Sequence, residues 1–106
     1  MKAINVLIVE DEMLIAETIK LYLRERGHSV AGIAISFDEA IDLLDKNNPD
    51  IILLDIRLNG LKSGIDIAKF LRSSANNTPY IILSSQFDSK TIKEAVHAGA
   101  SGYITK

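Results

Sequence analysis

Five short apolar runs alternate with four stretches that carry apolar residues at helical spacing, and this alternation constrains the fold more than any other feature. The runs cover residues 6–9, 30–35, 51–54, 80–83 and 102–105. Runs of this length, rich in Val, Ile and Leu, predict β-strands, and the stretches between them predict helices that bury one face. The apolar residues at helical spacing are Ile15, Ile19, Tyr22 and Leu23; Phe37, Ala40, Ile41 and Leu44; Ile67, Phe70 and Leu71; and Ile92, Ala95 and Val96.

The strict alternation of strands and helices predicts the architecture. Near-continuous apolar strands separated by helices indicate a parallel sheet covered on both faces, the doubly wound α/β arrangement. Ser36 followed by Glu39 has the form of a capping box at the start of the second helix, and Gly27 and Gly99 are typical helix ends. With 106 residues and no linker or repeat, the chain should form one domain.

Composition excludes several classes of function. Twelve basic and fourteen acidic residues give a net charge of −2 without a basic block, which argues against direct nucleic-acid binding. The absence of cysteine excludes disulfides, zinc–thiolate sites and a thiol nucleophile. The apolar run at residues 6–9 is too short for a signal peptide or a membrane span. We therefore expect a soluble cytoplasmic domain without membrane association.

Polar residues follow the predicted strands at the edge where such sheets bind ligands. They are Glu10, Asp11 and Glu12 after the first strand, Asp55 after the third, Ser84 and Ser85 after the fourth, and Lys106 after the fifth. Each alone has an ordinary explanation as a helix cap, a turn residue or a solvated charge. Together they point to a site, because clustered carboxylates repel unless a cation holds them, and an oxygen-only set suits Mg²⁺. A lysine and a hydroxyl beside that ion would suit a phosphoryl group.

Four segments carry a resemblance to a known family. In this order and spacing, "VLIVEDE", "PDIILLDIRL", "TPYIILSS" and "HAGASGYITK" closely resemble the response-regulator receiver domain (CheY-like) of two-component signal transduction. The resemblance runs over the whole chain. It implies a flavodoxin-like fold, with a parallel five-stranded sheet in the order 2-1-3-4-5.

The resemblance implies a phosphoryl-accepting site. Asp55 resembles the phospho-acceptor, which receives its phosphoryl group from the phosphohistidine of a sensor histidine kinase or phosphotransfer protein. Glu10 and Asp11 resemble the acidic pair that holds Mg²⁺ together with Asp55 and the backbone carbonyl of Arg57. Such a domain is no ordinary enzyme, because it catalyses only its own phosphorylation and dephosphorylation.

The resemblance also implies a switch. Ser84 matches the switch hydroxyl, Tyr103 the switch aromatic residue, and Lys106 the lysine that faces the phosphate. Phosphorylation in this family changes the surface formed by the fourth helix and the fifth strand. A downstream effector domain or partner would read that change.

The family usually has a fifth helix after the fifth strand, and this sequence ends at Lys106 before it. We expect the receiver domain of residues 1–106 to be truncated before that helix, which would leave the sheet face beside the first helix bare. A continuation of the chain, or a second copy in a homodimer, would then cover this apolar face.

Two other functions use similar residues. A haloacid-dehalogenase-like phosphatase has an aspartate nucleophile and Mg²⁺, but it requires a second aspartate two residues later, where this sequence has Arg57. A pseudo-receiver acts as an interaction module without phosphorylation. It normally lacks the acceptor, the acidic pair or the lysine, all of which have counterparts here.

Overall fold

The computed structural model describes residues 3–56, 64–74, 76–84, 93 and 99–105 of the chain. Strands and helices alternate over residues 5–84 as the apolar pattern predicts. The strands are β1 (Asn5–Val9), β2 (Ser29–Ala34), β3 (Ile51–Asp55), β4 (Tyr80–Ser84) and β5 (Gly102–Thr105), and the helices are α1 (Met13–Glu25), α2 (Phe37–Lys46) and α3 (Gly64–Ser73). The helix predicted from Ile92, Ala95 and Val96 lies outside the described residues.

The strands form one parallel sheet in the order β2-β1-β3-β4-β5. The order of the first four strands confirms the predicted doubly wound arrangement, and β5 pairs with β4 at the far edge. After β1 the chain moves to one side of the sheet to form β2, and it then returns to form β3 on the other side of β1. The carboxyl ends of β1 and β3 therefore lie side by side at the point where the strand order reverses, which is where open α/β sheets bind ligands.

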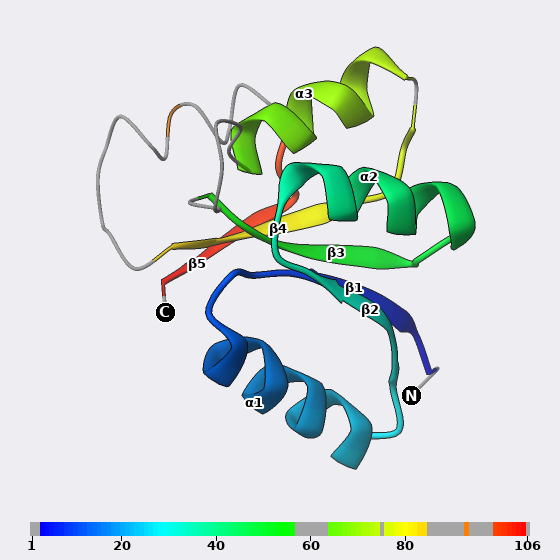
Figure 1. The fold of residues 1–106 in the computed structure, drawn as a ribbon, viewed down its shortest axis with the longest axis vertical. Helices are drawn as coiled ribbons and strands as arrows, with labels where there is room; N and C mark the ends of the chain where they lie inside the picture. The colour runs from blue at the N-terminus through cyan, green and yellow to red at the C-terminus, as the bar shows by residue number, and fades with distance from the viewer. Residues whose placement is uncertain (1–2, 57–63, 75, 85–92, 94–98, 106) are drawn as a thin grey trace.

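The described helices cover the two faces of the sheet unequally. Figure 1 shows α1 on one face and both α2 and α3 on the other. On the α1 face, Ala16 packs with Val6 and Ile8, and Ile19 and Leu23 surround this small cluster. Parallel strands have alternate side chains on opposite faces, so the next residues of each strand build the second, larger cluster under α2 and α3. That cluster contains Leu7, Val9, Ala34, Ala40, Leu44, Ile52, Leu54, Ile67, Ala68, Leu71, Tyr80 and Ile82.

One predicted core position in α1 is wrong. Tyr22 was expected on the buried face, but its side chain is 55% exposed, and the guanidinium of Arg26 lies 3.5 Å from the ring centroid. On the same side of the sheet, Leu53 and Ile81 are only partly buried and Ile104 is 49% exposed. The helices that the structure describes therefore leave the β3–β5 part of this face less covered than the part beneath α1.

Two predicted helix ends, at Ser36 and Gly27, agree with the local geometry, whereas the helix that Gly99 was expected to end lies outside the described residues. The Ser36 hydroxyl accepts a hydrogen bond from the Glu39 backbone nitrogen at 3.2 Å, which caps α2. The Glu39 carboxylate in turn accepts a hydrogen bond from the backbone nitrogen of Ile35, whereas a standard capping box would use the nitrogen of Ser36. Gly27 has a positive φ of 84° after α1, a conformation that glycine adopts without a steric cost. Among the described residues, none of the helices has the length and apolar character needed to cross a membrane.

Candidate functional site

Glu10 follows the end of β1 and carries a buried carboxylate. Its backbone nitrogen donates a hydrogen bond to the carbonyl of Ala34 at 2.9 Å, which continues the pairing of β1 with β2 by one residue. The residue is fully buried, and its Oε2 accepts a hydrogen bond of 3.3 Å from the nitrogen of Glu12. This hydrogen bond fixes the turn into α1 and holds the Glu10 carboxylate at the carboxyl edge of the sheet.

Asp55 is the last residue of β3. The apolar run predicted that this strand ends one residue earlier, at Leu54. Its Cα pairs with that of Leu83 in β4, and only 4% of the residue is exposed. The apolar residues before it anchor β3 in the middle of the sheet, with β1 on one side and β4 on the other. A central strand, paired on both sides, thus holds Asp55 at a nearly inaccessible position.

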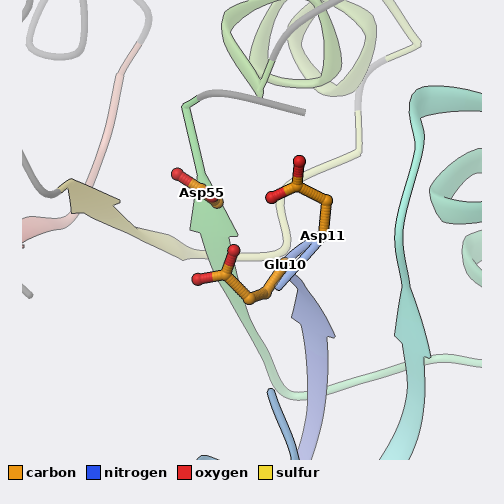
Figure 2. Close-up of side chains that lie close together, drawn as sticks. All are labelled: Glu10, Asp11 and Asp55. Carbon is orange, nitrogen blue, oxygen red and sulfur yellow. The ribbon is translucent and has the colours of Figure 1, made fainter. Parts of the chain in front are cut away.

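Three carboxylates converge at this edge. Glu10, Asp11 and Asp55 each offer one carboxylate oxygen, and these oxygens all lie within 4.8 Å of one another. Figure 2 shows that Glu10 and Asp11 come from the segment after β1, whereas Asp55 comes from the end of β3, and that the side chains gather around one space. Asp11 is partly exposed, so solvent reaches the cluster from its side. Glu12 was a further predicted acid of this edge, but it is exposed and is not one of the three.

The donor set fits a hard divalent cation. An octahedral Mg²⁺ with ligands at about 2.1 Å places neighbouring ligand oxygens roughly 3 Å apart. The three carboxylate oxygens, which lie within 4.8 Å of one another, would draw together around such an ion. Like charges at this separation also repel strongly when burial excludes the water that would screen them. A bound cation would relieve that repulsion, and the carboxylates would supply oxygen ligands of the type that Mg²⁺ prefers.

Gly64 packs closely against the backbone of Asp55, a contact that the sequence analysis missed. Its nitrogen donates a hydrogen bond of 2.8 Å to the carbonyl of Ile56, and a Cβ at this position would overlap the carbonyl oxygen of Asp55. The start of α3 therefore lies directly on the end of β3. One signal was available, since glycine is a poor helix former and its place at the start of a helix suggests a close backbone approach.

The structure describes the other predicted site residues less fully. Ser84 ends β4 and its Cα pairs with that of Thr105, while Tyr103 lies within β5 opposite Ile82. The backbone thus places Ser84 at the carboxyl edge, on the strand next to β3. Arg57, Ser85 and Lys106 lie outside the described residues.

Comparison with known proteins agrees with this geometry. The response regulator receiver domain family matches residues 6–106. The transcriptional regulatory protein MalR of Bacillus subtilis is 38% identical over 104 residues, which cover 97% of this chain and 44% of MalR. The cell cycle transcriptional regulator CtrA of Caulobacter vibrioides is 37% identical over 102 residues, covering 96% of this chain and 43% of CtrA. The chain thus spans less than half the length of these relatives.

Solved receiver domains have the same fold. The receiver domain of the Francisella response regulator 1452 is 35% identical with a TM-score of 0.88, over 97% of this chain and 84% of that one. The signal receiver domain of a modulated diguanylate cyclase from Desulfovibrio desulfuricans G20 is 34% identical with a TM-score of 0.88, over 99% of this chain and 82% of that one. With the sheet order and the acidic edge described above, these matches show that the chain belongs to the response regulator receiver domain family.

Proposed function

We propose that this receiver domain accepts a phosphoryl group on Asp55 and that phosphorylation changes its binding surface. The observation that carries the proposal is the placement of Asp55, nearly buried and within reach of the Glu10 and Asp11 carboxylates. Receiver domains work with histidine kinases, so the natural donor is a phosphohistidine on a sensor kinase or phosphotransfer protein.

Asp55 is the nucleophile in the proposed reaction. One of its carboxylate oxygens attacks the phosphorus atom in line, the phosphorus–nitrogen bond to the donor imidazole breaks, and that imidazole leaves with the bonding electron pair and takes a proton. The product is an aspartyl phosphate on Asp55 and a free histidine on the donor. The contact between Gly64 and the Asp55 carbonyl supports this role, because it fixes the backbone from which the nucleophile projects.

The metal proposed for this site is Mg²⁺, which receiver domains generally bind at an acidic pocket. Glu10, Asp11 and Asp55 would hold it, with the backbone carbonyl of Arg57 as a further ligand implied by the family resemblance. When bound, the ion supplies positive charge that offsets the charge of the carboxylates and of the incoming phosphoryl oxygens.

Three further residues complete the proposal. Lys106 would add a second positive charge beside the phosphoryl group. Ser84 would bond a phosphoryl oxygen, and Tyr103 would turn into the space that Ser84 leaves, so that the surface around β5 changes shape. The position of Ser84 at the end of β4, on the strand next to β3, supports its part in this switch.

The output of the switch belongs to a further domain or partner. MalR and CtrA are transcriptional regulators more than twice as long as this chain, so we propose an effector domain or effector protein as the reader. The receiver itself carries no basic block for nucleic acid, and we place its action in the cytoplasm, as a monomer or a homodimer.

Incubation with acetyl phosphate and Mg²⁺ tests the proposal against its alternatives. We expect intact-mass spectrometry to show one added phosphoryl group per chain, lost in Asp55→Asn and in the presence of EDTA. Asp45→Asn, which alters an exposed carboxylate of α2, should retain full labelling. No labelling would favour a pseudo-receiver, and hydrolysis of many acetyl phosphate molecules per chain would favour a phosphatase. Either result would overturn the assignment.

A further inference from the structure

A groove of about 530 Å³ lies between α2 and α3, away from the acidic edge. These helices lie side by side on the same face of the sheet (Figure 1). We name this feature the α2–α3 groove and define it by its apolar floor and its acidic rim. The floor consists of Phe37, Ile41, Leu44 and Phe70, and the rim consists of Asp38, Asp42 and Asp45.

The floor of the α2–α3 groove is apolar. The rings of Phe37 and Phe70 meet edge to face, with their centroids 6.3 Å apart and their planes at 85°. Leu44 is buried, whereas Phe37, Ile41 and Phe70 remain partly exposed. Aromatic and aliphatic surface held in a fixed arrangement favours an apolar side chain from a partner, because burial of such surface is favourable and little order must be created.

The rim places one carboxylate on each successive turn of α2. Asp38, Asp42 and Asp45 are spaced by four and three residues, so they lie along one side of the helix. Asp42 forms an exposed ion pair of 3.0 Å with Lys46, which contributes little in water. Among the residues that the structure describes, no ion pair joins Asp38 or Asp45. On the α3 side, Ser74 and Asn76 line the groove and add no positive charge.

The spread of these acids argues against a metal ion as the occupant. In the described part of the chain, only Glu10, Asp11 and Asp55 bring three acidic oxygens within reach of one another. The rim carboxylates instead extend over about 10 Å of α2, at 1.5 Å per residue. Such a row is complementary to several separate cations carried at regular intervals.

We propose that the α2–α3 groove binds a basic amphipathic helix of a partner protein. The partner helix would insert one or two large apolar side chains between Phe37, Ile41 and Phe70. Its lysines or arginines, one per turn on the flank of the apolar stripe that faces α2, would pair with Asp38, Asp42 and Asp45. Helices commonly bind in grooves of this kind through anchors at helical spacing, and charge complementarity then sets the register.

A synthetic peptide tests the proposal on the unphosphorylated protein. The probe is a helical peptide with leucines on one stripe and lysines at positions i, i+4 and i+7 beside it, titrated into ¹⁵N-labelled protein. We expect amide shifts in α2 and around Phe70, and no comparable shifts at Glu10, Asp11 or Asp55. The affinity should fall about tenfold for the double variant Asp38→Asn/Asp45→Asn, since two charge pairs are lost, and it should fall as salt is added.

Two matched controls separate the groove from general charge and from damage to the fold. The double variant Glu17→Gln/Glu25→Gln removes two exposed acids from α1 and should bind the peptide as the wild type does. A peptide with serines in place of the leucines should bind far more weakly, which shows that the floor is used. The thermal midpoints of the variants, followed by circular dichroism, verify that each remains folded.

Three results would overturn the proposal. One is a peptide that does not bind, or that binds the double variant Asp38→Asn/Asp45→Asn with the same affinity as the wild type. Another is a set of shifts centred on Glu10, Asp11 and Asp55, which would mean that the lysines bind this acidic cluster instead. The third is a concentration-dependent shift of the groove residues without peptide, which would show that a second copy of the chain occupies the groove.

Discussion

Gly64 lies directly against the carbonyl oxygen of Asp55, so that a Cβ at residue 64 would overlap that oxygen. The hydrogen bond of 2.8 Å from the Gly64 nitrogen to the Ile56 carbonyl holds the two segments together. The first residue of α3 is therefore packed on the last residue of β3. The position of the proposed nucleophile depends on the absence of a side chain nine residues later in the chain.

Replacement of Gly64 by alanine should damage both stability and the site. The added methyl group forces α3 away from β3, and overpacking of this kind costs about 1 to 3 kcal/mol of unfolding free energy. Urea denaturation measures the loss. Gly102→Ala is the matched control, because its nearest neighbour would be Ile81 Cγ1 at an ordinary 3.6 Å, and its effect should stay within about 0.5 kcal/mol. Equal effects of the two substitutions would contradict the proposed contact.

Asp55→Asn should stabilise the domain in the absence of metal. The substitution removes one of three clustered negative charges, two of which are buried, and the unfolding free energy should rise by about 1 kcal/mol. Added Mg²⁺ should stabilise the wild type more than the variant and so reduce the difference. Chemical denaturation with EDTA and with Mg²⁺ measures both effects, and the exposed Glu17→Gln serves as the control. A variant less stable than the wild type in EDTA would argue against repulsion within the cluster.

Glu10→Gln and Asp11→Asn should each weaken Mg²⁺ binding by about tenfold or more, because each removes a charged oxygen from the proposed ligand set. The measurement is the rise of the thermal midpoint as Mg²⁺ is added. Glu12→Gln changes the adjacent acid, which is exposed and outside the cluster, and it should leave the affinity unchanged. If all three substitutions weaken Mg²⁺ binding alike, the ion is attracted by the overall negative charge of this surface and is not held by specific ligands.

The Ser36 cap offers a test of local stability. Its hydroxyl accepts a hydrogen bond from the Glu39 nitrogen, and loss of such a cap costs about 1 kcal/mol. Urea denaturation of Ser36→Ala should show this loss. Ser73→Ala should have little effect, because the exposed Ser73 hydroxyl only donates to the carbonyl of Phe70 within its own helix. If the Ser36 cap contributes nothing to stability, Ser36→Ala and Ser73→Ala should have the same unfolding free energy.

The sheet and the acidic edge were predictable because each depends on a local pattern. Continuous apolar strands that alternate with helices leave few arrangements, and the carboxyl ends of neighbouring parallel strands meet at one edge. The strand end at Asp55 was predicted one residue early, because backbone pairing with Leu83 continues through a polar residue that no apolar pattern includes.

Features that depend on packing between elements were not predictable. In α1 the small Ala16, absent from the predicted face, is the buried residue and allows the helix to approach the sheet closely. Because each residue turns the helix by about 100°, Tyr22 lies about 120° from Ala16 around the axis of α1 and faces solvent. The α2–α3 groove and the contact of Gly64 with Asp55 likewise require the relative positions of two elements, which local sequence patterns do not specify.

Tyr80 should make the stability of the domain fall at high pH. Burial raises the pKa of its phenol above the ordinary 10.0, although the Arg72 charge opposes part of this effect. Above about pH 10 the unfolded chain therefore releases a proton that the folded domain still holds. Loss of that proton favours the unfolded state, so the unfolding free energy should decrease as pH rises beyond this value.

Urea denaturation between about pH 9 and pH 11 measures this decrease, and two Tyr→Phe variants identify its source. Tyr80→Phe removes the titrating group and should show a shallower loss of stability than the wild type. Tyr22→Phe removes an exposed phenol while it keeps the ring beside Arg26, and it should retain the wild-type slope. A slope that is the same in the wild type and in Tyr80→Phe would show that other groups cause the alkaline loss of stability.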